Sequence, residues 1–126
     1  MIKMSIDVLL IDPEEAYVKP LAIRLEKEFG YSIVITETEN GAKELMRQKK
    51  FDVVVMEPIV DQHNTLLGLI CDIKAVGIPV ILASGTEEER LRNRYGMARG
   101  KDFDAYLGIP YTAEELHAVF TSIIKK

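Results

Sequence analysis

The sequence contains a single cysteine, no surplus of positive charge and no apolar run of membrane-spanning length. The one cysteine, Cys71, cannot form an intramolecular disulfide. A formal net charge of −4 argues against nucleic acid as a partner, since nucleic-acid-binding proteins carry a basic footprint. No apolar run approaches the roughly 20 residues that a transmembrane helix needs, so we expect no membrane segment. The start of the chain has no signal-peptide layout, and a cytoplasmic protein is therefore expected.

The rest of the composition is that of an ordinary globular domain. The chain has 126 residues, of which 48% are hydrophobic and 29% are charged. A chain of this length and composition usually forms one domain with a buried core. No internal repeat, low-complexity tract or linker interrupts it. We therefore expect a single domain spanning residues 1–126.

The most informative stretch is FDVVVMEPIVD, from Phe51 to Asp61. Its four consecutive apolar residues, 53–56, are too few for a stable helix, and three of them are β-branched valines, which favour a buried strand. The run stops at Glu57, and Pro58 cannot continue a ladder of backbone hydrogen bonds. The pattern predicts an acid at the carboxyl end of a central strand, the edge at which open α/β sheets bind ligands.

Apolar runs of strand length alternate with helical patterns along the whole chain. This alternation predicts a parallel, doubly wound α/β sheet with helices on both faces, because right-handed crossovers place them there. Strands are expected at residues 6–11, 31–35, 53–56, 78–83 and 103–107, and a helix is expected after each.

Several helices carry recognisable boundary signals. Asp12 is predicted to cap the first helix, with Pro13 in the first helical position. Pro20 lies inside that helix and is expected to bend it. Thr86 is predicted to cap the helix after the fourth strand, and Thr112 opens a capping-box pattern before the last helix.

Four segments resemble, in order and spacing, the receiver domain of two-component response regulators. That family has a flavodoxin-like (βα)5 fold with strand order 2-1-3-4-5, and the resemblance implies the same fold here. Receivers accept a phosphoryl group on an aspartate at the end of the third strand, helped by an acidic pair, a hydroxyl residue and a lysine. The resembling segments are VLLID, ENGAKELMRQKKFDVVVMEP, IPVILAS and DAYLGIPY.

Matched residue by residue, the resemblance is incomplete at the phosphorylation site. Glu57 stands at the position of the phospho-accepting aspartate. Asp12 matches the first residue of the acidic pair, but Pro13 replaces the second, which usually contacts Mg²⁺. Ile109 occupies the lysine position. The acceptor, one metal ligand and the cation are thus replaced together.

The switch positions of the family are retained. Ser84 matches the hydroxyl residue after the fourth strand, and Tyr106 matches the aromatic switch residue in the fifth. Pro110 follows the lysine position, as in receivers, where the peptide bond before this proline is usually cis. The resemblance therefore implies that the scaffold and the switch remain although the phosphorylation site is altered.

The replacements predict weak or absent Mg²⁺ binding and no other cofactor. Mg²⁺ requires hard oxygen ligands in near-octahedral geometry, and the side chain of Pro13 supplies none. Phosphoryl transfer depends on positioning and on charge stabilisation, and Ile109 carries no charge. The extra methylene of Glu57 also displaces its carboxylate relative to an aspartate. We expect no enzymatic activity and no catalytic residue.

Three interpretations of the carboxylate of Glu57 remain open. It imitates the phosphorylated state and holds the switch in one arrangement, or it merely solvates a strand end in a decayed pocket. In the third interpretation, Asp12, Glu57 and one of the acids Glu14 and Glu15 form a weak cation site. Carboxylates that lie close together without such a cation would instead raise the pKa of one of them.

Five basic residues and no acidic ones lie between positions 90 and 101 in an otherwise acidic chain. They are interpreted either as a solvated helix with bases near its end, as the helix dipole prefers, or as a partner-docking patch. The resemblance favours docking, because helix four, strand five and helix five form the output and dimerisation face of receivers. A homodimer through that face is a further expectation. The basic patch comprises Arg90, Arg92, Arg94, Arg99 and Lys101.

Two other features receive a structural interpretation. The segment 58–68 is longer than in typical receivers and is expected to be a surface insertion or a lid beside the pocket. Its Asp61 and His63 faintly resemble the DxHxxG motif of cobalamin-binding domains, but Leu66 takes the glycine position, and His63 is expected to be solvent-exposed. His117 is expected to lie on the surface of the last helix.

The sequence as a whole predicts a stand-alone pseudo-receiver that signals by binding another protein without orthodox aspartyl phosphorylation. The expected partner is a kinase, another receiver or an output protein, and neither nucleic acid nor a membrane. One alternative is a single-domain response regulator phosphorylated on Glu57. Another is a flavodoxin-like domain that binds a small ligand or cofactor. The chain is also compatible with one excised domain of a longer protein.

Overall fold

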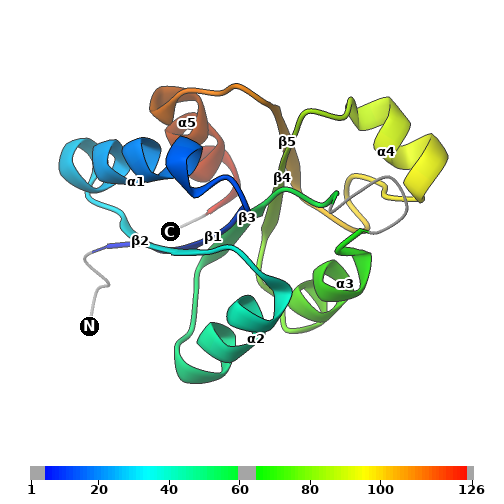
Figure 1. The fold of residues 1–126 in the computed structure, drawn as a ribbon, viewed down its shortest axis with the longest axis horizontal. Helices are drawn as coiled ribbons and strands as arrows, with labels where there is room; N and C mark the ends of the chain where they lie inside the picture. The colour runs from blue at the N-terminus through cyan, green and yellow to red at the C-terminus, as the bar shows by residue number, and fades with distance from the viewer. Residues whose placement is uncertain (1–4, 60–64, 125–126) are drawn as a thin grey trace.

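A computed structural model describes residues 5–59 and 65–124. Strands and helices alternate along the chain, as the apolar pattern predicts (Figure 1). The elements are β1 (Asp7–Ile11), α1 (Glu15–Phe29), β2 (Ser32–Thr36), α2 (Glu39–Gln48), β3 (Val53–Met56), α3 (Leu67–Ala75), β4 (Val80–Ser84), α4 (Glu88–Tyr95), β5 (Ala105–Gly108) and α5 (Ala113–Ile123).

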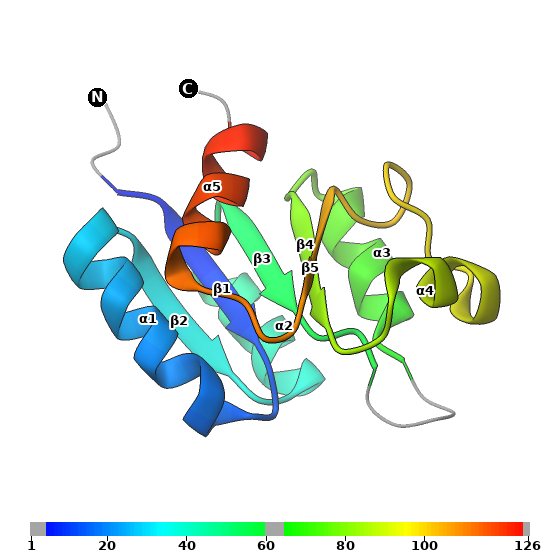
Figure 2. The same ribbon diagram turned by 90° about the horizontal axis from the view of Figure 1, so that it is seen from above.

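The strands form one parallel sheet in the order β2-β1-β3-β4-β5, which confirms the flavodoxin-like fold. Figure 2 shows them side by side and running in one direction. β3 lies at the centre, where Leu10 of β1 is in register with Val55 and Val55 is in register with Ile81 of β4. All four residues of β3 are buried, as expected for a strand covered on both faces.

Alternate side chains along each strand enter two separate cores. In β3, Val53 and Val55 face α1 and α5, whereas Val54 and Met56 face the helices α2, α3 and α4. Figure 1 shows α1 and α5 above the sheet and α2 and α3 below it, with α4 to the right of β4 and β5. Because the strands are parallel, all of their carboxyl ends meet at one edge, which we call the carboxyl edge.

Two predicted helix caps are wrong for related reasons. The helix α1 begins at Glu15 with Glu14 as its N-cap, and the carboxylate of Asp12 instead accepts a hydrogen bond from the N–H of Glu14 at 2.7 Å. The helix α4 begins after Glu87, and the N–H of Thr86 donates to the hydroxyl of Ser84 at 3.0 Å. In both places a short turn at the carboxyl edge separates the strand from its helix.

Other local predictions are confirmed. The helix α1 includes Pro20, as the sequence analysis placed it, and the helix ends at Gly30, which adopts a left-handed conformation with φ of 78°. Thr112 and Glu115 form the complete capping box of α5, with both hydrogen bonds present. The peptide bond before Pro110 is cis.

Four strands begin one or two residues later than expected. β1 begins at Asp7, β2 at Ser32, β4 at Val80 and β5 at Ala105. The apolar residues that precede β4 and β5 pack into the core before the strand ladder starts, and Phe103 is completely buried there. The apolar run in the sequence is therefore longer than the strand, because some of its residues are buried without taking part in strand pairing. Among the described helices, none combines the length and apolar character needed to cross a membrane.

Candidate functional site

Three polar residues from different strand ends meet at the carboxyl edge. Asp12 follows β1, Glu57 follows β3 and Ser84 ends β4. Asp12 is 5% exposed and Ser84 is 1% exposed, while Glu57 is half-buried. The strand order places β3 between β1 and β4, so the Glu57 carboxylate lies between the two other groups. The structure therefore brings together the acidic position, the acceptor position and the hydroxyl position that the sequence predicted.

The carboxylate of Glu57 contacts the ends of two strands. Its Oε1 accepts a hydrogen bond from the N–H of Ile59 at 3.1 Å. The hydroxyl of Ser84 and the backbone N–H of Gly85 also interact with this carboxylate and favour its charged form. Glu57 is thus directed toward the start of the β4–α4 loop.

Two acidic groups of this site have raised pKa values. Burial raises the pKa of Glu57 above its usual 4.5, and the negative charge of Asp12 raises it further, against the opposing hydrogen bonds. Burial is also the main cause that raises the pKa of Asp12, with a smaller contribution from Glu14. No lysine or arginine among the described residues lowers either pKa. The carboxyl pair has no counter-ion within the described chain.

The described residues at this edge lack part of the ligand set that a magnesium site requires. Pro13 is exposed, and its side chain has no oxygen that could bind Mg²⁺. Among the described residues, no group of three metal-binding side chains is arranged to hold an ion. The side chain of Glu15 lies outside what the structure describes. The fit to the divalent cation of receiver domains is therefore poor.

A cavity of about 330 Å³ opens beside Glu57. Much of its wall is apolar and comes from β1, from the loop after β1 and from both ends of the 58–68 segment. Its rim includes two acids that the sequence analysis missed. The acids Glu37 and Glu39 follow β2, whose carboxyl end reaches the same edge, and this position was their only sequence signal. The lining residues are Ile11, Pro13, Glu37, Thr38, Glu39, Glu57, Ile59 and Leu66.

Tyr106 is linked to the same β4–α4 loop. Its hydroxyl donates to the carbonyl oxygen of Thr86 at 2.7 Å, and the carbonyl of Ser84 lies 3.3 Å away. The hydroxyl of Ser84 accepts from the N–H of Thr86 and faces Glu57. Burial raises the pKa of Tyr106, with a smaller contribution from the charge of Glu57. A short chain of contacts therefore joins Glu57 to Tyr106 through Ser84 and Thr86.

The remaining positions of the resemblance are occupied by apolar or neutral groups. The side chain of Ile109 packs against the core under α1 and α5, and its N–H donates to the carbonyl of Ser84 at 3.0 Å. It supplies no cation to Glu57. Pro110 follows in the cis form and is exposed.

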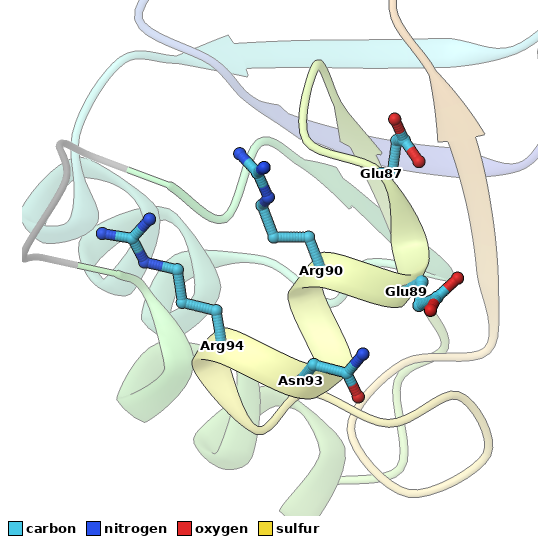
Figure 3. Close-up of a pocket in the computed structure, with 5 residues that line it drawn as sticks. All are labelled: Glu87, Glu89, Arg90, Asn93 and Arg94. Atoms are coloured by element: carbon cyan, nitrogen blue, oxygen red, sulfur yellow. The ribbon is translucent and has the colours of Figure 1, made fainter.

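The basic patch is divided by an ion pair. Arg99 binds both carboxylate oxygens of Glu88, at 2.8 and 2.7 Å, and lies beyond the end of α4 together with Lys101. Figure 3 shows Arg90 and Arg94 extending to one side of α4, away from β5, while the carboxylates of Glu87 and Glu89 lie nearer β5. Arg92 is exposed and lies near Glu88. Arg90 and Arg94 are the members of the patch that share one open surface.

His117 is not a plain surface residue, which corrects the sequence-based prediction. Its ring stacks on Phe29 with the centroids 4.2 Å apart, and its Nδ1 lies 2.7 Å from the hydroxyl of Tyr31. It is half-buried where the middle of α5 packs beside the end of α1. The spacing of three residues from Phe120, on the apolar stripe of α5, is the signal that could have placed it there. Asp61 and His63 lie outside the described residues.

No protein-family model and no curated protein matches the sequence. Solved structures do match over nearly the whole chain. A two-component response regulator from Clostridium difficile has 24% identity and a TM-score of 0.78, with 94% of this chain and 95% of the other covered. A response regulator from Thermotoga maritima has 19% identity and a TM-score of 0.80 over 98% of this chain and all of the other. An orphan response regulator of H. pylori has 22% identity and a TM-score of 0.75, with the same shares covered. The chain therefore has the fold of response-regulator receiver domains.

Proposed function

We propose that this protein is a pseudo-receiver: a signalling module of the two-component type that acts by binding another protein. In this proposal Glu57 replaces the phosphorylated aspartate and holds the switch residues in one arrangement. The observation that carries it is the position of the Glu57 carboxylate, against Ser84 and Gly85 at the start of the loop that also binds the Tyr106 hydroxyl.

The chemistry of the site supports the proposed absence of orthodox phosphorylation. Transfer of a phosphoryl group to a carboxylate requires stabilisation of the charge on the transferring group. The position after Asp12 is an exposed proline, and Ile109 faces the apolar core where receivers place a lysine. The raised pKa of Glu57 indicates that the site disfavours negative charge already. A dianionic phosphoryl group would enlarge that unfavourable charge.

The same features support a constitutive role for Glu57. A carboxylate that interacts with Ser84 and the N–H of Gly85 supplies a permanent negative group to the β4–α4 loop. Tyr106 completes this loop through its hydrogen bond to Thr86, and its ring packs against the core that includes α3 and α4. A single arrangement of the loop and of Tyr106 would present one constant surface to a partner, without a phosphorylation signal.

An amide NMR titration of the complete chain with Mg²⁺, followed by Mg²⁺ with beryllofluoride, tests the first half of the proposal. Beryllofluoride imitates the acyl phosphate of active receivers. We expect no specific shifts around Asp12, Glu57 and Ser84. Shifts at these residues that spread to Tyr106 would overturn the proposal in favour of phosphorylation on Glu57.

A restored variant provides the positive control for this titration. It carries Pro13→Asp, Glu57→Asp and Ile109→Lys, which return the residues that the resemblance assigns to these positions. We expect this variant to respond to Mg²⁺ with beryllofluoride if it remains folded, as judged from its amide spectrum.

The substitution Glu57→Gln tests the second half. If Glu57 holds the switch residues in one arrangement, this substitution should shift the amide signals of Gly85, Thr86 and Tyr106. Glu89→Gln, on exposed α4, is the matched control and should affect only its own neighbours. Shifts of Glu57→Gln that stop at Ile59 would support a decayed pocket instead.

A further inference from the structure

An open cavity of about 360 Å³ lies at the opposite end of the molecule from Glu57. It is formed where the end of α2 meets the turn between α3 and β4, two segments that belong to neighbouring helices on one face of the sheet (Figure 1). We call it the Lys50–Val76 groove. Its floor and rim are made by Met46, Arg47, Lys49, Lys50, Val76 and Ile78.

The groove has an exposed apolar part. Val76 is 66% exposed, and only one other large apolar side chain among the described residues, Ile23 at 48%, is classed as exposed. Met46 and Ile78 are half-buried beside it. Val76 is the C-cap of α3, and the hydrogen-bonded turn through Gly77 fixes it in this position. Val76, Met46 and Ile78 thus line one cavity together and give the groove an apolar wall against which an apolar side chain could pack.

The groove also has a cationic rim in a protein of net charge −4. Arg47 pairs with Glu44, and Lys49 pairs with Asp7 at 3.1 Å while lying over the ring of Phe51. Lys50 is exposed and has no ion pair in the described part of the chain. The dipole of α2 explains a basic residue in its last turn. It does not explain Lys50, which lies beyond the helix, or the exposed Val76 across the groove.

We propose that the Lys50–Val76 groove binds a short acidic segment of a partner protein that carries at least one apolar side chain. The apolar side chain would lie against Val76, Met46 and Ile78, and a flanking carboxylate would pair with Lys50. We favour a peptide that has both an apolar side chain and a carboxylate, because the groove has both an apolar wall and a cationic rim. A purely acidic peptide would leave the apolar wall uncovered, and a purely apolar peptide would leave Lys50 without a counter-charge. The site is separate from Glu57 and does not depend on the state of the switch.

Peptide titrations of the complete, ¹⁵N-labelled chain test this inference. The probe is a nine-residue peptide with alternating glutamate and leucine at its centre, compared with one peptide in which serine replaces leucine and one in which glutamine replaces glutamate. We expect the first probe to shift the amides of residues 47–51 and 76–78 selectively. The serine probe should bind roughly tenfold more weakly, the order of magnitude for one buried apolar side chain, and the glutamine probe about twofold to fivefold more weakly, as for one exposed ion pair.

Matched variants identify the contacts. Lys50→Glu and Val76→Lys should each weaken binding of the first probe about fivefold to tenfold. The controls are Lys27→Glu and Ile23→Lys, which make the corresponding charge reversal and apolar-to-lysine change at exposed positions of α1. They should leave binding unchanged. Because all four positions are on the surface, unfolding midpoints should be retained. Glu57→Gln should bind the probe as the wild type does, which separates this test from that of the proposed function.

Three outcomes would overturn the inference. The first is the absence of selective shifts in the groove at millimolar probe. The second is equal binding of the leucine and serine probes, which would indicate charge attraction alone. The third is a groove response to vesicles of anionic phospholipid together with no response to the peptide, which would assign the surface to a membrane.

Discussion

At the scale of single residues, Glu57 determines the character of the carboxyl edge. It is a half-buried carboxylate with another acid, Asp12, close enough to raise its pKa, and no cation of the described chain balances the pair. The interactions with Ile59, Ser84 and Gly85 oppose that increase without removing it. The site therefore stabilises the charged form of Glu57 less well than water does.

This unfavourable charge predicts a pH-dependent stability. Since the pKa of Glu57 is higher in the folded state than its ordinary 4.5, the folded protein holds more protons than the unfolded chain just above that pH. The free energy of unfolding should therefore fall as the pH rises through this window, by at most about 1.4 kcal/mol per pH unit for one group. Asp12, with a raised pKa, contributes in the same direction.

Glu57→Gln should raise the stability at pH 7 and reduce this slope, because glutamine keeps an oxygen for the Ile59 N–H and carries no charge. Urea unfolding between pH 4 and pH 8 measures both effects. Glu89→Gln is again the control and should reproduce the wild-type curve. An equal or lower stability of Glu57→Gln at pH 7 would contradict the expectation.

At the scale of elements, local and nonlocal signals differ in how well the sequence reveals them. The capping box of α5 was predictable because all of its atoms lie within one turn of the chain. The caps assigned to Asp12 and Thr86 were wrong because neighbouring backbone groups in turns of the carboxyl edge use them instead. The strand order and the meeting of Asp12, Glu57 and Ser84 followed from the resemblance and from the parallel sheet.

Contacts between residues that are far apart in the chain were harder to predict from the sequence. Glu37 and Glu39 reach the cavity beside Glu57 only because β2 and β3 flank β1. His117 meets Phe29 and Tyr31 only when α5 packs beside α1. The acids at the cavity leave no periodic pattern, because they depend on strands that are separated in the chain. For His117, the three-residue spacing from Phe120 indicates the buried side of α5 but not the partners on α1 and before β2.

The α5 cap supplies an element-scale prediction. Thr112→Ala should lower the free energy of unfolding by about 1 kcal/mol, because the N–H of Glu115 loses its side-chain acceptor. Thr121→Ala, the same substitution at an exposed position inside the same helix, should have no effect or a slightly stabilising one, since alanine is the better helix former. Thermal or urea unfolding distinguishes the two, and equal effects would exclude the cap as the cause.

At the scale of the whole molecule, the cluster of Phe29, Tyr31 and His117 connects the early and late parts of the chain. It joins the end of α1 and the residue before β2 to the middle of α5. Tyr31 also packs edge-on against Phe120, at a centroid distance of 4.8 Å. This cluster lies at the end of the molecule away from Glu57, so its energetics can be measured without changing the switch.

A double-mutant cycle measures this connection. His117→Ala should lower the free energy of unfolding by about 1–3 kcal/mol, because it removes the stacking on Phe29 and leaves the Tyr31 hydroxyl without its partner. Tyr31→Phe should lower it by about 1 kcal/mol. The double variant should be less destabilised than the sum by roughly 0.5 kcal/mol or more. Strict additivity would show that the hydrogen bond contributes nothing to stability.

The strand order also determines the sequence in which the site can be assembled during synthesis. β1 pairs with β2 and β3, so the first three strands can form a partial sheet before β4 and β5 have left the ribosome. Glu57 is part of that early unit, whereas Ser84 and Tyr106 arrive with the last two strands. Until then the carboxylate has free access to water. The contact between Glu57 and the β4–α4 loop is therefore made only after β4 and this loop have been synthesised.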